Sequence, residues 1–280
     1  MKVTTSNAFW NMTNMKKYHA DIGIIGGTGI YNTELLTNAE SVKIFTPYGS
    51  PSDLITIGQY NGKLVAFIPR HGKEHTIPPH KVNSRANIWA LHSIGVTRII
   101  APSAVGSLQD NFKPGDIVLS DQFIDFTKRR EYSFYDEGKV YHISSADPFC
   151  NELKQIFLSV GDQLHYDVHD QATYICIEGP RFSTRAESKY YKEILHGDII
   201  GMTLVPECVL ARELEICYMS IATVTDYDVW FENPVSSKEI LQVLTKNSRK
   251  IKDLLARYIP LIPESRDKCK CKIALKDAMV

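Results

Sequence analysis

ADIGIIGGTGIY, residues 20–31, opens the fold, since an apolar run ends at Gly26 and Gly27 and a glycine-rich turn follows. A short apolar run that stops at glycines is typical of a buried strand. The turn does not match the dinucleotide fingerprint G-x-G-x-x-G, because its third glycine position falls on Asn32. Backbone amides and the Thr28 hydroxyl can cradle a phosphate here, and a plain tight turn is the alternative.

Strand and helix patterns alternate along the chain beyond this turn. Residues 53–70 predict a hairpin, because two apolar runs flank Asn61-Gly62, a strong type I′ turn signal. Residues 82–95 and 237–258 have helical spacing, and residues 115–126 predict one strand. The alternation indicates an α/β fold, with helices covering the faces of a sheet.

Two further helices have recognisable starts. Asp147-Pro148 predicts a helix that begins there, since Asp caps a helix and Pro suits its first turn. Thr184 and Glu187 have the spacing of a capping box, which predicts a helix from about Thr184 to Leu195.

The composition is that of an ordinary globular protein. The 280 residues are 44% hydrophobic and 23% charged, and the formal net charge is zero. This balance gives no electrostatic field for nucleic acid or a membrane surface, and no apolar run reaches the length of a bilayer span. Without a signal pattern at the N-terminus, we expect a cytoplasmic protein. We expect a flexible leader over residues 1–19, one domain over 20–262 and a tail over 263–280.

The six cysteines fall into two groups. Four lie in apolar contexts and predict small buried side chains: Cys150, Cys176, Cys208 and Cys217. Cys269 and Cys271 lie in DKCKCK, close together in the tail, where we expect them to be exposed. We predict a disulfide or redox-active pair there, with a flexible free-thiol tail as the alternative.

Six polar clusters directly follow predicted strands. They are GGTG, RHGKEH, PSAVGS, GPRFS, MT and TDYD. Ligands of α/β sheets bind beyond the ends of strands, so the clusters predict one composite site.

RHGKEH, residues 70–75, matches the zinc-peptidase pattern H-x-x-E-H through His71, Glu74 and His75. That pattern needs a helix, but prolines and a glycine crowd this segment and favour a loop. Arg70 and His71 instead suit an anion, because a guanidinium fork stands beside a second donor.

TDYD, residues 225–228, places two carboxyl groups at the end of a strand. Asp226 and Asp228 are two residues apart, so extended backbone points both to the same side. Paired carboxyl groups can separate into a neutral donor and a charged acceptor. A solvated acidic turn is the alternative.

Taken together, the chain resembles the 5′-methylthioadenosine phosphorylases, within the purine nucleoside phosphorylase family. The resemblance runs from about Asp21 to Tyr258 and rests on GIIGGTGIY, RHGKEHTIPPHKVNSRANIWAL, PGDIVLSDQFIDF, SFYD, IEGPRFSTRAES, MTLVPE and ATVTDYD. It implies a single domain with a mixed central sheet flanked by helices, a homo-oligomer (trimer or dimer of trimers), and no metal or organic cofactor.

The resemblance also implies roles for individual residues. Those expected at the phosphate are Thr28, Arg70, His71, Ser103 and Thr203, with Ala104 beside it. Those expected to line the nucleoside pocket are Ala104, Phe182 and Met202. Asp226 and Asp228 are expected to bind the base, with Asp226 as the catalytic acid. Ser183 and Ser237 are expected to set substrate choice, and a neighbouring subunit is expected to offer His142 near the 5′ substituent.

The implied enzyme is a pentosyltransferase of purine and methionine salvage. With inorganic phosphate it would convert 5′-methylthioadenosine to adenine and 5-methylthioribose 1-phosphate. The alternatives are a broader purine nucleoside phosphorylase for adenosine, inosine or guanosine, a zinc peptidase built on HGKEH, and a non-catalytic nucleotide-binding protein.

Overall fold

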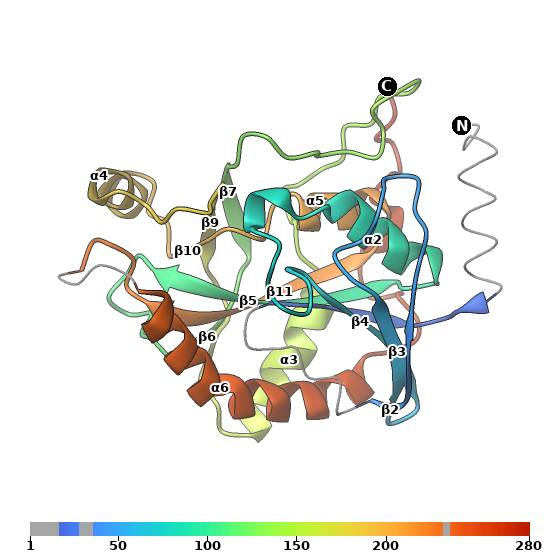
Figure 1. Ribbon diagram of the computed structural model, residues 1–280, viewed down its shortest axis with the longest axis horizontal. Coiled ribbons are helices and arrows are strands. Elements are labelled where there is room, and N and C mark those ends of the chain that lie inside the picture. The colour runs from blue at the N-terminus through green and yellow to red at the C-terminus, as the bar shows by residue number, and fades with distance from the viewer. Residues whose placement is uncertain (1–16, 28–35, 232–235) are drawn as a thin grey trace.

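The computed structural model describes residues 17–27, 36–231 and 236–280, and these form one large sheet covered by helices (Figure 1). The strands are β1 (Ile22–Gly26), β2 (Thr37–Val42), β3 (Ile55–Tyr60), β4 (Lys63–Pro69), β5 (Arg98–Ser107), β6 (Ile117–Leu119), β7 (Gln122–Phe126), β8 (Val168–His169), β9 (Thr173–Ile177), β10 (Ile199–Gly201) and β11 (Cys217–Asp226). Their order is β2-β3-β4-β1-β5-β10-β9-β7, and β11 pairs with β5 and with β6, which pairs with β8.

Strand β5 is the centre of the sheet because three strands pair with it. Its first residues lie parallel to β1, and nearly its whole length lies parallel to β11, from Arg98↔Cys217 to Gly106↔Asp226. Strand β4 lies parallel to β1 on the other side. The carboxyl ends of β4, β1, β5 and β11 therefore meet at one edge of the sheet. Strand β10 runs antiparallel to the end of β5, which makes the sheet mixed.

Helices cover both faces of this sheet (Figure 1). They are α2 (Ser84–Ser93), α3 (Asn151–Gln163), α4 (Arg185–Lys189), which continues as a π-helical segment (Tyr190–Ile194), α5 (Glu207–Glu213) and α6 (Ser237–Tyr258). Three short 3₁₀ helices add to them: Pro79–Lys81, Ile259–Leu261 and Cys271–Ile273. Helices α2 and α5 pack together on one face, and α3 and α6 pack together on the other.

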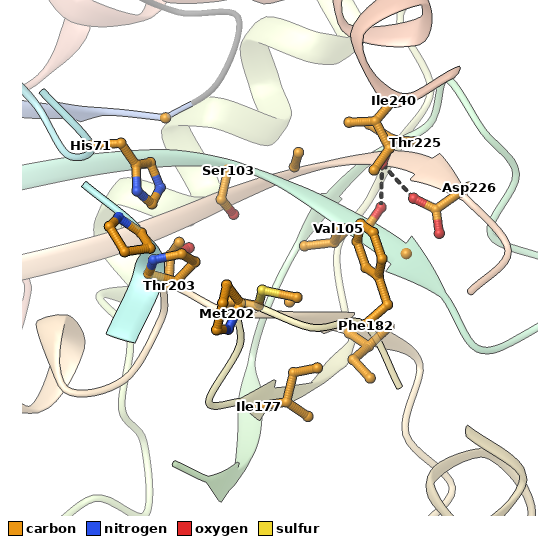
Figure 2. A pocket seen from close by; sticks show the side chains of 18 of the residues that line it. His71, Ser103, Val105, Ile177, Phe182, Met202, Thr203, Thr225, Asp226 and Ile240 are labelled. Carbon is orange, nitrogen blue, oxygen red and sulfur yellow. Dashed lines mark hydrogen bonds between the residues drawn. The ribbon is translucent and has the colours of Figure 1, made fainter. Parts of the chain in front are cut away.

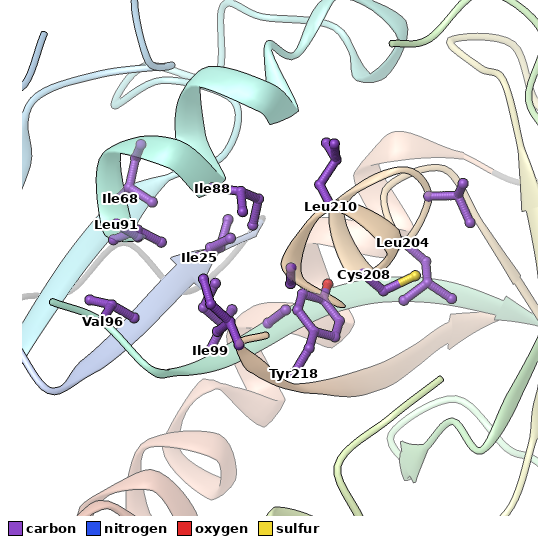
Figure 3. Close-up of a cluster of buried hydrophobic side chains, with 14 of the residues drawn as sticks. Ile25, Ile68, Ile88, Leu91, Val96, Ile99, Leu204, Cys208, Leu210 and Tyr218 are labelled. Atoms are coloured by element: carbon purple, nitrogen blue, oxygen red, sulfur yellow. The ribbon is translucent and has the colours of Figure 1, made fainter. Parts of the chain in front are cut away.

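Each face has its own apolar core. On the first, Ile88 of α2 and Leu210 of α5 are fully buried over Ile25 and Ile99 of the sheet (Figure 3). Full burial of such a side chain contributes about 1.5–3 kcal/mol relative to exposure. On the second face the buried side chains come from α3, α6 and the strands, and include Leu153, Phe157, Leu254 and Tyr258.

Several local predictions are confirmed. Residues 55–69 form the predicted hairpin, and both turn residues, Asn61 (φ 44°) and Gly62 (φ 83°), have the positive φ of a type I′ turn. Thr184 and Glu187 make the predicted capping box at the start of α4. Helix α6 has the predicted bounds, and the predicted mixed α/β fold is confirmed.

Two predictions of element bounds are wrong. Residues 115–126 form two strands rather than one, because β6 pairs with β11 and β8 while β7 pairs with β9. The helix expected from Asp147 begins later, at Asn151, with Cys150 as its N-cap. Long-range pairing decides the first case, and no local pattern carries it.

The two ends of the chain were expected to stand apart from the domain. Residues 1–16 of the expected leader lie outside the described residues. In the tail, the expected exposure of Cys271 is wrong, since this side chain is 8% exposed and belongs to the core of the second face. Among the described residues, no helix is long and apolar enough to cross a membrane.

Candidate active site

A cavity of about 760 Å³ opens at the edge where the parallel strands end. All six polar clusters singled out in the sequence contribute to its lining, which confirms the expected composite site. Predicted site residues that line it are Arg70, His71, Ser103, Ala104, Phe182, Ser183, Met202, Thr203, Asp226 and Asp228. Figure 2 shows His71, Ser103 and Thr203 toward one end, Asp226 toward the other, and Met202 between them. The volume suits a small organic ligand.

Arg70 provides a buried positive charge at the first end. Its guanidinium donates from Nε and Nη2 to the two carboxylate oxygens of Glu207, both at 2.8 Å, and from Nη1 to the Pro102 carbonyl at 3.1 Å. Burial acts to lower the pKa of Arg70, but the charge and hydrogen bonds of Glu207 outweigh it and raise that pKa. These contacts use three of the five guanidinium N–H groups, which leaves donors for a bound anion.

Glu207 is a site residue that the sequence interpretation did not assign. It lies at the start of α5, is fully buried, and accepts a further hydrogen bond from the Tyr218 hydroxyl at 2.7 Å. Breaking a buried ion pair by removing one partner costs about 3–5 kcal/mol. The carboxylate therefore holds Arg70 in place. An acidic residue directly before the apolar run Cys208–Ala211 was the signal that could have identified it.

The surroundings of His71 favour its neutral form at neutral pH. Burial first, and then the charge of Arg70, lower its pKa to about 4. Its Nδ1 lies 2.9 Å from the Ile77 carbonyl, which can only accept, so Nδ1 carries the proton. Nε2 is then an acceptor, and a nearby dianion would favour protonation that turns it into a donor.

Asp226 and Thr225 form a short hydrogen-bonded chain at the second end. The Thr225 hydroxyl lies 2.7 Å from Oδ2 of Asp226 and 3.1 Å from the Val105 carbonyl (Figure 2). A hydroxyl has one proton, so it cannot fully donate to both acceptors. A protonated Asp226 resolves this, because it donates to Thr225 while Thr225 donates to Val105. Burial raises the pKa of Asp226, which favours that proton.

Asp228 is almost fully buried in the pocket wall, and its Oδ2 has no hydrogen-bond partner among the described residues. Burial raises its pKa, although the nearby Ser188 and Ser183 hydroxyls partly offset the rise. Neither serine hydroxyl has a hydrogen bond of ordinary geometry. Buried polar atoms without partners are costly, so this wall is suited to the polar edge of a ligand.

Gly106 on β5 makes room for these carboxyl groups. A Cβ atom at this position would lie 2.8 Å from Oδ1 of Asp226 and 3.4 Å from the backbone nitrogen of Asp228. The same nitrogen donates to Oδ1 of Asp226 at 2.9 Å. Any residue larger than glycine at position 106 would therefore displace the carboxyl pair.

Arg130 fixes the wall between the two ends, and it was also missed. Its Nη1 donates to the carbonyls of Met202 (2.8 Å) and Val205 (2.6 Å), and its Nη2 donates to those of Ile177 (3.3 Å) and Glu178 (2.6 Å). One guanidinium thus ties the end of β9 to the segment after β10. Ile177 and Met202 line the pocket on these two segments.

Three predicted site residues are not placed in the pocket. Thr28 lies outside the described residues, and the side chain of Ser237 is likewise not described, although Ile240 and Leu241 of the same helix line the pocket. His142 is exposed in the loop before α3, where its backbone nitrogen donates to Ala278 of the tail at 2.8 Å. The HGKEH segment forms turns instead of the helix that a zinc peptidase needs.

Comparison with known proteins identifies the family. Residues 21–260 match the model of the phosphorylase superfamily. The chain belongs to the phosphorylase superfamily.

Relatives of this phosphorylase are similar along nearly its whole length. It is 57% identical to S-methyl-5′-thioadenosine phosphorylase of Hyperthermus butylicus, over 93% of this chain and 96% of the relative. It is 58% identical to the protein of the same name from Nitrosopumilus maritimus, over 92% of this chain and 97% of the relative.

Solved structures of methylthioadenosine phosphorylases are also similar to this chain along nearly its whole length. A methylthioadenosine phosphorylase from an Antarctic soil metagenomic library superposes with a TM-score of 0.88 at 48% identity, covering 94% of this chain and 93% of that one. Methylthioadenosine phosphorylase from Schistosoma mansoni in complex with adenine has a TM-score of 0.87 at 37% identity, covering 92% and 97%. Fold and sequence therefore assign this phosphorylase to the same family.

Because the carboxyl of Asp228 is buried, we predict that its ionisation lowers the free energy of unfolding of the phosphorylase as pH rises. Because its folded pKa is raised, its stabilising contribution is complete below the unfolded value, about 3.9, and is lost as pH rises through the folded pKa. An asparagine side chain cannot ionise, and asparagine tolerates the positive φ of 50° at this position. Asp228→Asn should therefore gain free energy of unfolding relative to wild type as pH rises.

Urea unfolding at about pH 4.5 and about pH 7.5 measures this difference. Asp167→Asn, which changes an exposed carboxyl, is the matched control and should stay parallel to wild type. If the free energy of unfolding of Asp228→Asn changes with pH by the same amount as that of wild type, the ionisation of Asp228 carries no cost.

Proposed function

We propose that this phosphorylase cleaves 5′-methylthioadenosine with inorganic phosphate, releasing adenine and 5-methylthioribose 1-phosphate. The observation that carries the proposal is a single cavity with a buried Arg70 toward one end and the carboxyl pair of Asp226 and Asp228 toward the other. Relatives at 57–58% identity are named for this nucleoside, and the Schistosoma mansoni enzyme has been solved with adenine and with methylthioadenosine.

Phosphate binds at the Arg70 end in this proposal. The two remaining guanidinium N–H groups of Arg70 and the hydroxyls of Ser103 and Thr203 donate to its oxygens, with Ala104 beside it and Thr28 completing the subsite. His71 becomes protonated, and the proton comes from solvent or from the phosphate hydroxyl. Fixing phosphate below the anomeric carbon removes the entropy of encounter, and its charge stabilises the oxocarbenium-like centre that forms.

Adenine binds at the carboxyl end. When the base binds, the proton of Asp226 turns from Thr225 to ring nitrogen 7 and is transferred to it, so that the base leaves without a full negative charge. The ionised or water-bridged Asp228 accepts from the exocyclic 6-amino group, which gives its unpaired Oδ2 a partner. Phe182 and Met202 enclose the sugar and the base. Phosphate is a co-substrate, and we propose that the reaction uses no metal or organic cofactor.

A 6-oxo base fits this wall less well. Inosine and guanosine would place a carbonyl against the acceptor Asp228, and a buried acceptor without a donor is penalised. Ser183 is a small residue near Asp228, and it and Ser237 are the positions that we propose set substrate choice. The methylthio nucleoside is accordingly favoured over the broader purine nucleoside alternative.

The function is tested by incubating the protein with 5′-methylthioadenosine, with and without phosphate, and separating the products by chromatography. Adenine and 5-methylthioribose 1-phosphate should form only when phosphate is present. Adenine released equally well without phosphate would indicate a hydrolase, and binding without release would indicate a nucleotide-binding protein. Inosine cleaved as efficiently as methylthioadenosine would favour the broader phosphorylase.

Arg70→Ala should raise the phosphate KM far more than the nucleoside KM. Two lost charge-assisted hydrogen bonds correspond to about a 10²-fold rise for phosphate. Because the substitution also leaves Glu207 buried without its partner, Arg70→Lys serves as the matched variant that keeps the charge but not the fork. Steady-state kinetics at varied phosphate check the assignment, and equal rises in both KM values would contradict it.

Asp226→Ala should reduce kcat by about 10²-fold or more, the usual scale for loss of a general acid. Asp226→Asn should keep part of the nucleoside binding but lose most turnover, because an amide does not deliver a proton. It should also shift selectivity toward inosine, whose 6-oxo side suits an amide donor. Kinetics with both nucleosides measure the effect, and an Asp226→Asn variant with wild-type kcat would rule out acid catalysis by this residue.

We propose that the active protein is a trimer or a dimer of trimers, in which a neighbour's His142 reaches the 5′ substituent. Two exposed large apolar side chains that line the pocket, Phe182 and Leu241, support an interface there. Closed rotational symmetry makes shared sites natural. Sedimentation at assay concentration tests the proposal, and a fully active monomer would contradict it.

The cytoplasm is the proposed compartment, where thiols stay reduced. All six cysteines are free thiols in the structure. The disulfide expected between Cys269 and Cys271 stays a prediction. The packing of these two residues against Cys150 and Cys217 suggests a different role for them.

A further inference from the structure

Four of the six cysteines gather at one place, away from the pocket. Cys150 caps the N-terminus of α3, Cys217 is the first residue of β11, and Cys269 and Cys271 come from the tail. Their four sulfur atoms all lie within 4.8 Å of one another. Cys150, Cys217 and Cys271 are buried and Cys269 is partly exposed. Three segments far apart in sequence thus bring four thiols together.

The spacing matches a tetrahedral metal–thiolate site. Zinc–sulfur bonds of about 2.3 Å place the four sulfurs of a Cys₄ site about 3.8 Å apart. Cys217 and Cys269 lie 3.4 Å apart, and no pair exceeds 4.8 Å, so side-chain adjustments of about 1 Å or less would suffice. A disulfide would instead bring two sulfurs to about 2.05 Å and leave the other two as a separate pair.

A buried guanidinium, which also pairs with Glu152 at 3.5 Å, lies beside the cluster. A zinc ion with four thiolates carries two net negative charges, which need compensation where water is excluded. The buried Arg98 lies on the β5 side, with Nη1 3.9 Å from the Cys217 sulfur. Its Nε donates to the Pro263 carbonyl at 3.0 Å, so the same guanidinium also holds the start of the tail. The exposed Lys270 stands between the two tail cysteines.

We propose that Cys150, Cys217, Cys269 and Cys271 form a structural Zn²⁺ site that fastens the C-terminal tail to the starts of α3 and β11. Zinc binding displaces the thiol protons into solvent and changes no oxidation state. The tail beyond the site pairs with the loop that carries His142, through Val280 to Val140 at 3.1 Å and His142 to Ala278 at 2.8 Å. The ion would therefore also anchor this loop.

The site is tested by elemental analysis of protein purified under reducing conditions without chelator and dialysed against a small excess of Zn²⁺. Wild type should retain about one zinc per chain after removal of free metal. Cys271→Ser and Cys269→Ser should each lose most of it, whereas Cys208→Ser, a buried thiol outside the cluster, should keep it. Cobalt-loaded wild type should show the strong visible absorption of tetrahedral Co²⁺–thiolate, which Cys271→Ser should lack.

Retention of zinc in both cluster variants would place the metal elsewhere and overturn the proposal. Failure of the reduced wild type to bind zinc would overturn it as well. Two disulfides in the freshly isolated protein, found by intact mass without reductant, together with that failure would assign the cluster to disulfide bonding instead. None of these readouts depends on the proposed reaction, so they fail or succeed independently of it.

Discussion

The buried ion pair between Arg70 and Glu207 is the interaction on which the pocket depends. It joins the residue after β4 to the first turn of α5, and Arg70 also donates to Pro102 on β5. Three elements therefore share one guanidinium at the floor of the cavity. A guanidinium buried to this degree is tolerated only because its charge is balanced and hydrogen-bonded. The same pairing leaves two N–H groups for an anion. Burial of His71, and after it the charge of Arg70, lowers the pKa of that imidazole.

The fold was largely predictable because its local signals agree with its packing. The Asn61-Gly62 turn, the capping box of α4 and the 22-residue helix α6 are each specified within their own segments. The division of residues 115–126 into β6 and β7 was not predictable, because different partner strands, β11 and β9, decide it. Neither partner is adjacent in sequence, and periodicity carries no information on pairing.

The site was predictable to a similar degree and for a related reason. Polar side chains that follow parallel strands must meet, so Arg70, Ser103 and Asp226 could be assigned to one cavity before their positions were known. Glu207, Arg130 and Gly106 act through other residues, and their roles exist only once β4, α5 and β5 are assembled. The thiol cluster shows the same limit: the tail cysteines predicted a local pair, whereas the fold surrounds them with Cys150 and Cys217.

The central claim is that Glu207 holds Arg70 in position for phosphate. Steady-state kinetics of Glu207→Gln test it most directly, with Glu213→Gln, a second buried carboxyl on the same helix that bonds to Ser133 and Phe134, as control. We predict that Glu207→Gln raises the phosphate KM by about tenfold or more while the nucleoside KM changes by less than about twofold. Equal changes in the two KM values, or an unchanged phosphate KM in a folded variant, would contradict the account.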